Sequence, residues 1–131
     1  TAAIASDPLS APALNSLGYT LAERGERLPE AVSFIERALK VEPDNPAYFD
    51  SLGWALFKQG RTEEAEPYLR KAADALPSQS VILDHYGDVL LRRGKLGEAI
   101  GVWERALAGD GLDVDVAAIQ KKIKDAKGRQ K

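Results

Sequence analysis

The sequence predicts an all-α fold, a solenoid of antiparallel helix pairs, and three observations support this. The chain of 131 residues repeats itself at a spacing of 34 positions. Within each repeat, apolar residues recur at the three- and four-residue spacing of amphipathic helices. Glycines and prolines stand between these stretches, where helices are expected to end. A period of this length is typical of helical hairpins that stack on one another to bury a continuous core.

Composition limits the class of protein. The chain is 44% hydrophobic and 29% charged, as in a soluble folded protein, and its length fits one domain. It has no cysteine, which excludes disulfides, zinc thiolate sites and thiol catalysis. No apolar run approaches the ~20 residues that a membrane helix needs, and a net charge of −2 favours no class of partner. Because even position 1 is not methionine, we expect a fragment or a processed chain.

The elements follow in order along the chain. Asp7-Pro8 lies 35 positions before Glu42-Pro43, where repeat 1 is expected to end. Residues 1–10 are therefore expected to be the end of a truncated preceding repeat. Repeat 1 is predicted over 11–44, repeat 2 over 45–78 and repeat 3 over 79–111. A capping helix should follow over 112–127, starting near Asp113, and 128–131 form a tail.

Repeat 2 shows the helix signals most clearly. Asn45 is a good N-cap, Pro46 suits the first turn, and Gly60 should end the first helix. Thr62 is expected to cap the second helix, which Pro77 stops. In the capping helix we expect an inward stripe of Val116, Ile119, Ile123 and Ala126, with Gln120, Lys121, Lys122 and Lys124 outward.

Small residues recur in fixed columns of the repeat. The columns are Gly18, Gly53 and Gly87; Ala31, Ala65 and Ala99; Ala38, Ala72 and Ala106; and the prolines Pro43 and Pro77. A glycine inside a helix costs about 1 kcal/mol relative to alanine. Its recurrence at matching positions therefore predicts a close approach of two helices, and a bulky residue at Gly53 or Ala65 should be disruptive.

These columns resemble the tetratricopeptide repeat, or TPR, in a form common in bacterial repeat proteins. The first-helix sets that carry the resemblance are Leu14/Leu17/Gly18/Leu21, Phe49/Leu52/Gly53/Leu56 and Leu83/Tyr86/Gly87/Leu90. The resemblance covers roughly residues 11–111. It implies a right-handed solenoid of about three repeats, whose first helices line a concave groove. It also implies protein binding rather than catalysis, in either the bacterial cytoplasm or the envelope.

The resemblance places a set of residues in the groove, outside the packing columns. They are Asn15, Tyr19 and Ala22 from repeat 1; Asp50, Trp54, Phe57 and Lys58 from repeat 2; and Asp84, Asp88, Leu91 and Arg92 from repeat 3. Trp54 and Phe57 would be apolar anchors for a protein or peptide ligand. The three aspartates would receive a Lys, an Arg or an N-terminal amine.

A structural interpretation of the same residues stays open. Trp54 and Tyr19 could pack against neighbouring helices, and the aspartates could only solubilise the surface. Some family members bind C-terminal carboxylates through groove lysines, arginines and asparagines. The columns of that clamp hold Asn15, Asp50 and Asp84 here, without the cations, so we predict no binding of chaperone tails.

Catalytic and metal sites find little support. His85 is the only histidine, which leaves no dyad, triad or two-histidine metal site, and it is expected to be a partly exposed or a packing residue. Asp110, Asp113 and Asp115 lack the glycine and glutamate of a calcium loop, and the charge on Asp113 and Asp115 is better explained as capping a helix start. We therefore predict no enzyme, cofactor or metal. The cationic tail lacks the aromatics of a nucleic-acid site.

Two functions remain. The first is a binding module that acts as an adaptor or scaffold within a larger repeat protein. The second is a structural segment of a larger solenoid, or one that associates with itself through an apolar N-terminal edge formed by Ile4, Leu9 and Leu14.

Overall fold

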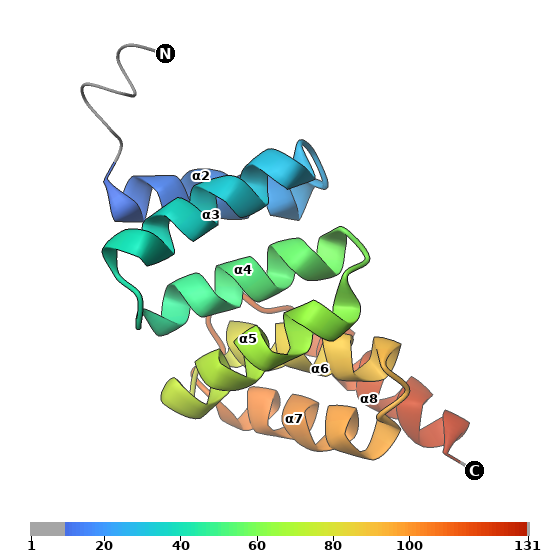
Figure 1. Cartoon of the computed structure of the whole chain (residues 1–131). Helices are drawn as coiled ribbons and strands as arrows, with labels where there is room; N and C mark the ends of the chain where they lie inside the picture. Colours follow the sequence, from blue (N-terminus) through green and yellow to red (C-terminus); the bar gives the residue numbers. More distant parts are fainter. Residues whose placement is uncertain (1–9, 131) are drawn as a thin grey trace.

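A computed structural model describes residues 10–130 of the chain (Figure 1). This part contains seven helices and no strand, which confirms the all-α prediction. The helices are α2 (Ala11–Arg24), α3 (Leu28–Val41), α4 (Pro46–Lys58), α5 (Thr62–Ala75), α6 (Ser80–Arg92), α7 (Leu96–Ala108) and α8 (Val116–Arg129). The predicted end of a preceding repeat, and with it Ile4 and Leu9, lies outside the described residues.

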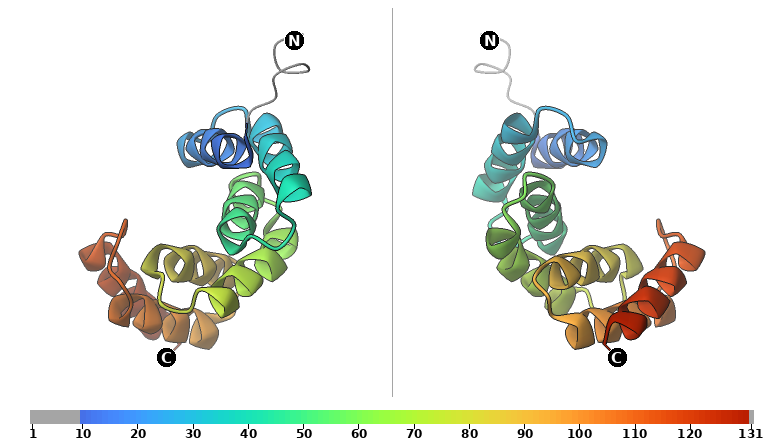
Figure 2. Two further views of the ribbon diagram at one scale, coloured as in Figure 1. Left: turned by 90° about the vertical axis from the view of Figure 1, so that its left-hand side faces the viewer. Right: turned by 90° about the vertical axis from the view of Figure 1, so that its right-hand side faces the viewer.

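The helices pack as consecutive pairs, α2 with α3, α4 with α5 and α6 with α7, and α8 covers α7. Figure 2 shows the stack curving like a letter C, with α2, α4 and α6 on the inner side and α3, α5 and α7 on the outer side. The last helix, α8, forms the opposite arm of the curve. The first helices of the pairs therefore line a concave face, as a TPR-like solenoid requires.

The glycine column marks where the paired helices touch. A Cβ added at Gly53 would lie 2.6 Å from Leu69 Cγ and 3.2 Å from the carbonyl oxygen of Ala65. Gly18 meets Ile35 in the same way, and Gly87 lies against the indole of Trp103. All three glycines are buried, so their missing side chains let each first helix approach its return helix.

Helix ends follow the predicted chemistry with two exceptions. Asn45 caps α4 by accepting a hydrogen bond from Ala47 N at 2.9 Å, and Gly60 follows its end with φ +83°. Thr62, however, is the first residue of α5 rather than its cap, because Arg61 holds the N-cap position. The last helix begins at Val116 rather than at Asp113, because Asp115 supplies its cap by accepting from Ala118 N.

Burial corrects several expected positions. In α8, Ile119, Ile123 and Ala126 are buried as predicted, but Val116 is 46% exposed because it lies in the first turn, beyond the edge of α7. Leu14 is buried with Ala11, Ala38 and Tyr48, so it belongs to the core rather than to an exposed edge. Leu17, in contrast, is 37% exposed. It occupies the column of the buried Leu52, but no helix among residues 10–130 covers that side of α2.

The loop between α7 and α8 is fastened to the start of α6. Ser80, which is fully buried, donates a hydrogen bond to Ala106 O at 2.7 Å and accepts one from Gly111 N at 2.8 Å. The carboxylate of Asp110 accepts from the backbone N–H groups of Ser80 and Leu112, and these bonds lower the pKa of Asp110. Residues 110–112 of this loop are thus held by hydrogen bonds, next to Asp113, which lines the site described next.

Candidate binding groove

The concave face holds most of the residues expected there, at different depths. Asp50 and Trp54 are buried, at 7% and 8% exposure. Lys58 and Arg92 are exposed. The half-buried residues are Asn15, Tyr19, Phe57, Asp84, Asp88 and Leu91. Ala22 does not reach the groove, because its methyl group is completely buried in the core with Ala31 and Ile35.

A buried network around His85 forms the floor. Its Nδ1–H donates to Asp50 Oδ1 at 2.9 Å, and its Nε2 lies 3.5 Å from the hydroxyl of Tyr19. The imidazole stacks on the indole of Trp54, with ring centroids 3.9 Å apart. The Trp54 Nε1–H in turn donates to the carboxylate of Glu23. Asp50 and Trp54 therefore have partners within the chain, and a ligand would meet only their edges.

Two of the three aspartates already have a cation. Lys122 Nζ lies 2.9 Å from Asp84 Oδ1 and 2.9 Å from Asp88 Oδ1. Lys122 was expected to point outward from α8, but this helix forms the opposite arm of the curve and directs the ammonium group into the concave face. Burial raises the pKa of Asp88 despite the ion pair. Asp84 and Asp88 thus bind the chain's own lysine.

Two cavities open along α4, and Trp54 lines the second of them. The first has a volume of about 530 Å³ and lies over the first half of α4; its polar lining is Asn15, Ser16, Tyr19, Glu23, Asp50, Ser51 and Asp113. The second has a volume of about 540 Å³ and lies over the last turns of α4, α6 and α8; its lining is Trp54, Phe57, Lys58, Asp88, Leu91, Arg92 and Arg129. We call them the acidic cavity and the cationic cavity.

Comparisons with known proteins agree with this geometry. A family model described as tetratricopeptide repeat matches residues 24–80. A TPR repeat-containing protein of Pseudomonas aeruginosa is 47% identical over 85 residues, which is 65% of this chain and 14% of that protein. The chain is built from tetratricopeptide repeats. The TPR chain spans about a seventh of the length of the curated relative that it matches.

Solved TPR structures share the fold. The Sgt2 TPR domain from Aspergillus fumigatus matches with a TM-score of 0.80 and 20% identity, over 91% of this chain and 78% of that chain. The first TPR of Spaghetti (RPAP3), bound to the HSP90 peptide SRMEEVD, matches with a TM-score of 0.80 and 19% identity, over 92% and 93% of the two chains. At these identities the matches show the fold.

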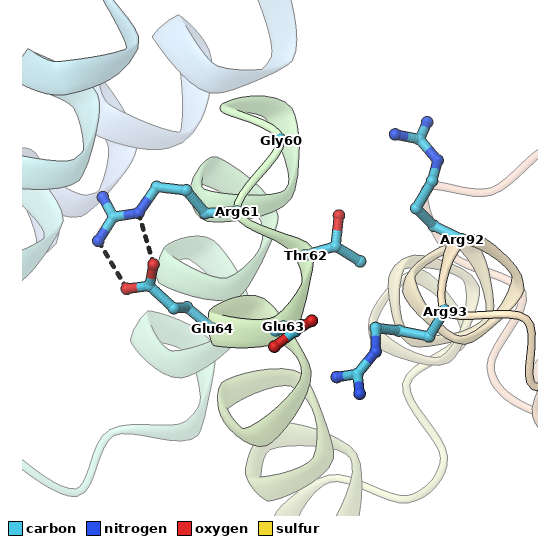
Figure 3. Close-up of a pocket in the computed structure, with 7 residues that line it drawn as sticks. All are labelled: Gly60, Arg61, Thr62, Glu63, Glu64, Arg92 and Arg93. Atoms are coloured by element: carbon cyan, nitrogen blue, oxygen red, sulfur yellow. Dashed lines mark hydrogen bonds and ion pairs between the residues drawn. The ribbon is translucent and has the colours of Figure 1, made fainter.

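A third cavity lies at the edge of the TPR stack, beside the turn between α4 and α5. It measures about 590 Å³ and is lined by Gly60, Arg61, Thr62, Glu63, Glu64, Arg92 and Arg93 (Figure 3). Arg61 is turned onto Glu64, with two hydrogen bonds of 3.0 and 2.7 Å, and Arg93 pairs with the buried Glu66 at 3.1 Å. Three of the five charged residues of this cavity, Arg61, Glu64 and Arg93, are thus already paired.

The sequence analysis missed five charged or ionisable groove residues, Glu23, His85, Asp113, Lys122 and Arg129, and two serines that line the acidic cavity, Ser16 and Ser51. Glu23 could have been found, because it falls 35 positions before Lys58, in the same column as Lys58 and Arg92. His85 was noted but not placed in the buried floor. Asp113, Lys122 and Arg129 come from the loop and helix after the last repeat, and the repeat alignment does not cover that segment.

No helix in the described range 10–130 is long and apolar enough to cross a membrane. In the same range, no three side chains of the histidine, cysteine, aspartate and glutamate types converge as a metal site. The TPR groove thus offers hydrogen bonds, charges and aromatic edges as its means of recognition.

The stability of this TPR chain should fall as the pH rises above neutrality. Burial disfavours the charged form of His85, but Asp50, with Asp84 and Asp88, outweighs burial and raises its pKa. The stabilisation is fully present below the ordinary histidine pKa of about 6.5 and is lost as the pH passes the higher folded-state pKa. Urea unfolding at a series of pH values should show this decrease.

The matched protein for this measurement is His85→Gln. It retains the other titratable groups near the ring, which are Asp50, Tyr19, Asp84, Asp88 and Lys122, so only the titration of the imidazole is removed. Its unfolding free energy should be nearly flat over the same pH interval. Equal pH slopes in both proteins would show that His85 does not carry the effect.

Proposed function

We propose that this TPR chain binds a peptide or an extended protein segment in its concave groove, as an adaptor or scaffold module within a larger repeat protein. The observation that carries the proposal is the pair of cavities along α4, of about 530 and 540 Å³. They lie side by side along α4 and together give an extended surface. A segment lying across both would contact the edges of Tyr19 and Trp54 and the face of Phe57.

One structural neighbour, the first TPR of Spaghetti (RPAP3), supports this type of ligand, since it is bound to a short peptide. That peptide, SRMEEVD, ends in acidic residues, whereas the acidic cavity here contains carboxylates in the corresponding first-helix positions of α2 and α4. We therefore propose a different peptide chemistry, and the prediction against chaperone tails is part of this proposal.

Catalysis has no place in the proposal. The one histidine holds Asp50 and stacks on Trp54 beneath the surface. The alternative function, self-association of a structural segment, is favoured by one observation, the 37% exposure of Leu17 on α2. A single exposed leucine is a smaller surface than the groove, which is why binding in the groove is the stronger candidate.

The groove proposal predicts that a double charge reversal, Lys58→Glu with Arg92→Glu, abolishes the selection of peptides. Both side chains are exposed, and they lie over the rings of Trp54 and Phe57 at 5.1 Å, so the change alters the groove without opening the core. Phage-displayed random dodecapeptides should enrich on the parent chain and fail to enrich on this variant. Circular dichroism melting should show that the variant stays folded.

Lys40→Glu with Arg105→Glu is the matched control. It makes the same change in charge at exposed positions of α3 and α7, on the outer side of the curve, and should select the same peptides as the parent. Peptides that enrich equally on all three proteins would contradict the groove proposal. If self-association were the function, the parent would scatter light as a dimer, Leu17→Glu would be a monomer, and no peptide would enrich.

A further inference from the structure

The groove carries a separation of charge that is absent from the chain as a whole. The lining of the acidic cavity contains three carboxylates, Glu23, Asp50 and Asp113, and no lysine or arginine. The lining of the cationic cavity contains Lys58, Arg92 and Arg129 against the single carboxylate of Asp88. The net charge of the chain is only −2, so this separation is a local property of the concave face.

We infer that the partner is a bipolar segment: a lysine or arginine side chain enters the acidic cavity, an apolar residue covers Trp54 and Phe57, and an aspartate or glutamate reaches the cationic cavity. The inference rests on the proposed function and names the partner's chemistry. It assigns a ligand of opposite polarity to each end of one groove, which fixes the register of the bound segment.

The acidic cavity has an acceptor without a donor. The Oδ1 atom of Asn15 is buried and has no hydrogen-bond partner among residues 10–130, and Asn15 lines this cavity. A buried acceptor that lacks a donor is unfavourable by about 1–3 kcal/mol. The N–H groups of a guanidinium or ammonium entering the cavity would supply that donor and would also face the carboxylates.

Within this cavity the carboxylates are not equally engaged. Asp50 accepts from His85, and Glu23 accepts from Trp54. Asp113 is exposed at the opposite side, on the loop fastened by Ser80. It holds a left-handed backbone conformation, with φ +60°, which aspartate tolerates better than most residues do. The three residues before Asp113 in this loop are hydrogen-bonded, while the carboxylate of Asp113 itself is exposed to a ligand.

The cationic cavity is assembled from the last turns of three helices. Lys58 ends α4, Arg92 ends α6 and Arg129 ends α8. A cation in the last turn of a helix interacts favourably with the helix dipole, and this effect alone would explain the presence of each residue taken by itself. Their convergence on one cavity next to Phe57 and Leu91 adds a binding surface, because their outer N–H groups remain available to a carboxylate.

The test starts from the peptides that the parent chain enriches in the phage experiment. The inference expects these peptides to carry a basic and an acidic residue separated by apolar or aromatic ones. The tightest of them is then synthesised with a fluorescent label, and its affinity is measured by anisotropy. The affinity should fall as the salt concentration rises.

Conservative variants separate charge from folding. Glu23→Gln keeps an acceptor for Trp54, and Asp113→Asn keeps a residue that tolerates the left-handed conformation. The double variant should bind the labelled peptide about tenfold more weakly, as for a loss of about 1.4 kcal/mol. A peptide with its basic residue replaced by glutamine should no longer distinguish the variant from the parent. Glu36→Gln with Asp74→Asn, at exposed positions of α3 and α5, is the matched control and should bind like the parent.

The outcomes distinguish this inference from the proposed function. If peptides enrich on the parent and on Lys40→Glu/Arg105→Glu but lack a basic residue, the groove binds peptides and the bipolar inference is wrong. The bipolar inference is also wrong if the Glu23→Gln/Asp113→Asn variant binds the labelled peptide with the full affinity of the parent. If no peptide depends on the groove, both proposals are wrong.

Discussion

Replacing Gly53 by leucine is expected to lower the free energy of unfolding by about 3 kcal/mol, at the upper end of the cost of overpacking. The new Cβ alone would lie 2.6 Å from Leu69 Cγ and 3.2 Å from the backbone oxygen of Ala65. Leu69 is completely buried and Ala65 is fixed in α5, so neither can move aside without separating the two helices. Thermal and urea unfolding would measure the loss.

Gly101 provides the matched control for this substitution. It also lies inside a helix, α7, but a Cβ there would meet no atom within 4 Å. Gly101→Leu should leave the stability unchanged or raise it slightly, because leucine has the higher helix propensity. Equal melting temperatures for Gly53→Leu and Gly101→Leu would show that the glycine column does not report close helix packing.

Removing the imidazole of His85 is expected to cost about 3 kcal/mol, the lower end of the penalty for leaving one member of a buried ion pair without its partner. His85 and Asp50 are 5% and 7% exposed, and their side chains meet at 2.9 Å. His85→Ala would leave the Asp50 carboxylate buried with no donor and would remove the ring that stacks on Trp54.

A double-mutant cycle measures the pair itself. His85→Ala, Asp50→Ala and the double variant should be unfolded in urea under one buffer condition. The double variant should be more stable than the sum of the two single losses predicts, by more than 1 kcal/mol, since contacting residues are not additive. Additive losses would mean that the two side chains act independently and that the hydrogen bond contributes little.

The sequence was sufficient for the fold because its signals are local and repeated. Gly53, Asn45 and Gly60 each determine a contact or a helix end within their own hairpin. The recurrence of the same pattern at a spacing of 34 residues strengthens the prediction. Thr62 was predicted to be the N-cap of α5, but it is the first residue of the helix. Arg61, which holds the N-cap position, lacks the usual side chain of a cap and therefore gives no signal in the sequence.

The site was harder to predict, because its chemistry depends on contacts between elements far apart in the chain. Nothing in the sequence around Lys122 indicates that it meets Asp84 and Asp88, 38 and 34 positions earlier. That contact exists only because the stack curves and α8 lies on its opposite arm. The burial of Trp54 depends likewise on His85 from the next repeat. Repeat columns identify which face a residue occupies, whereas the depth of a residue depends on curvature.

His85 also has a consequence for the mechanics of the array. In most solenoids each repeat contacts only its immediate neighbours, so the repeats can separate and unfold one after another. Here the ring of His85 in the third repeat lies 3.5 Å from the hydroxyl of Tyr19 in the first, across the second. This contact joins two repeats that are not neighbours in the stack, so unfolding of the first repeat should also remove a contact from the third.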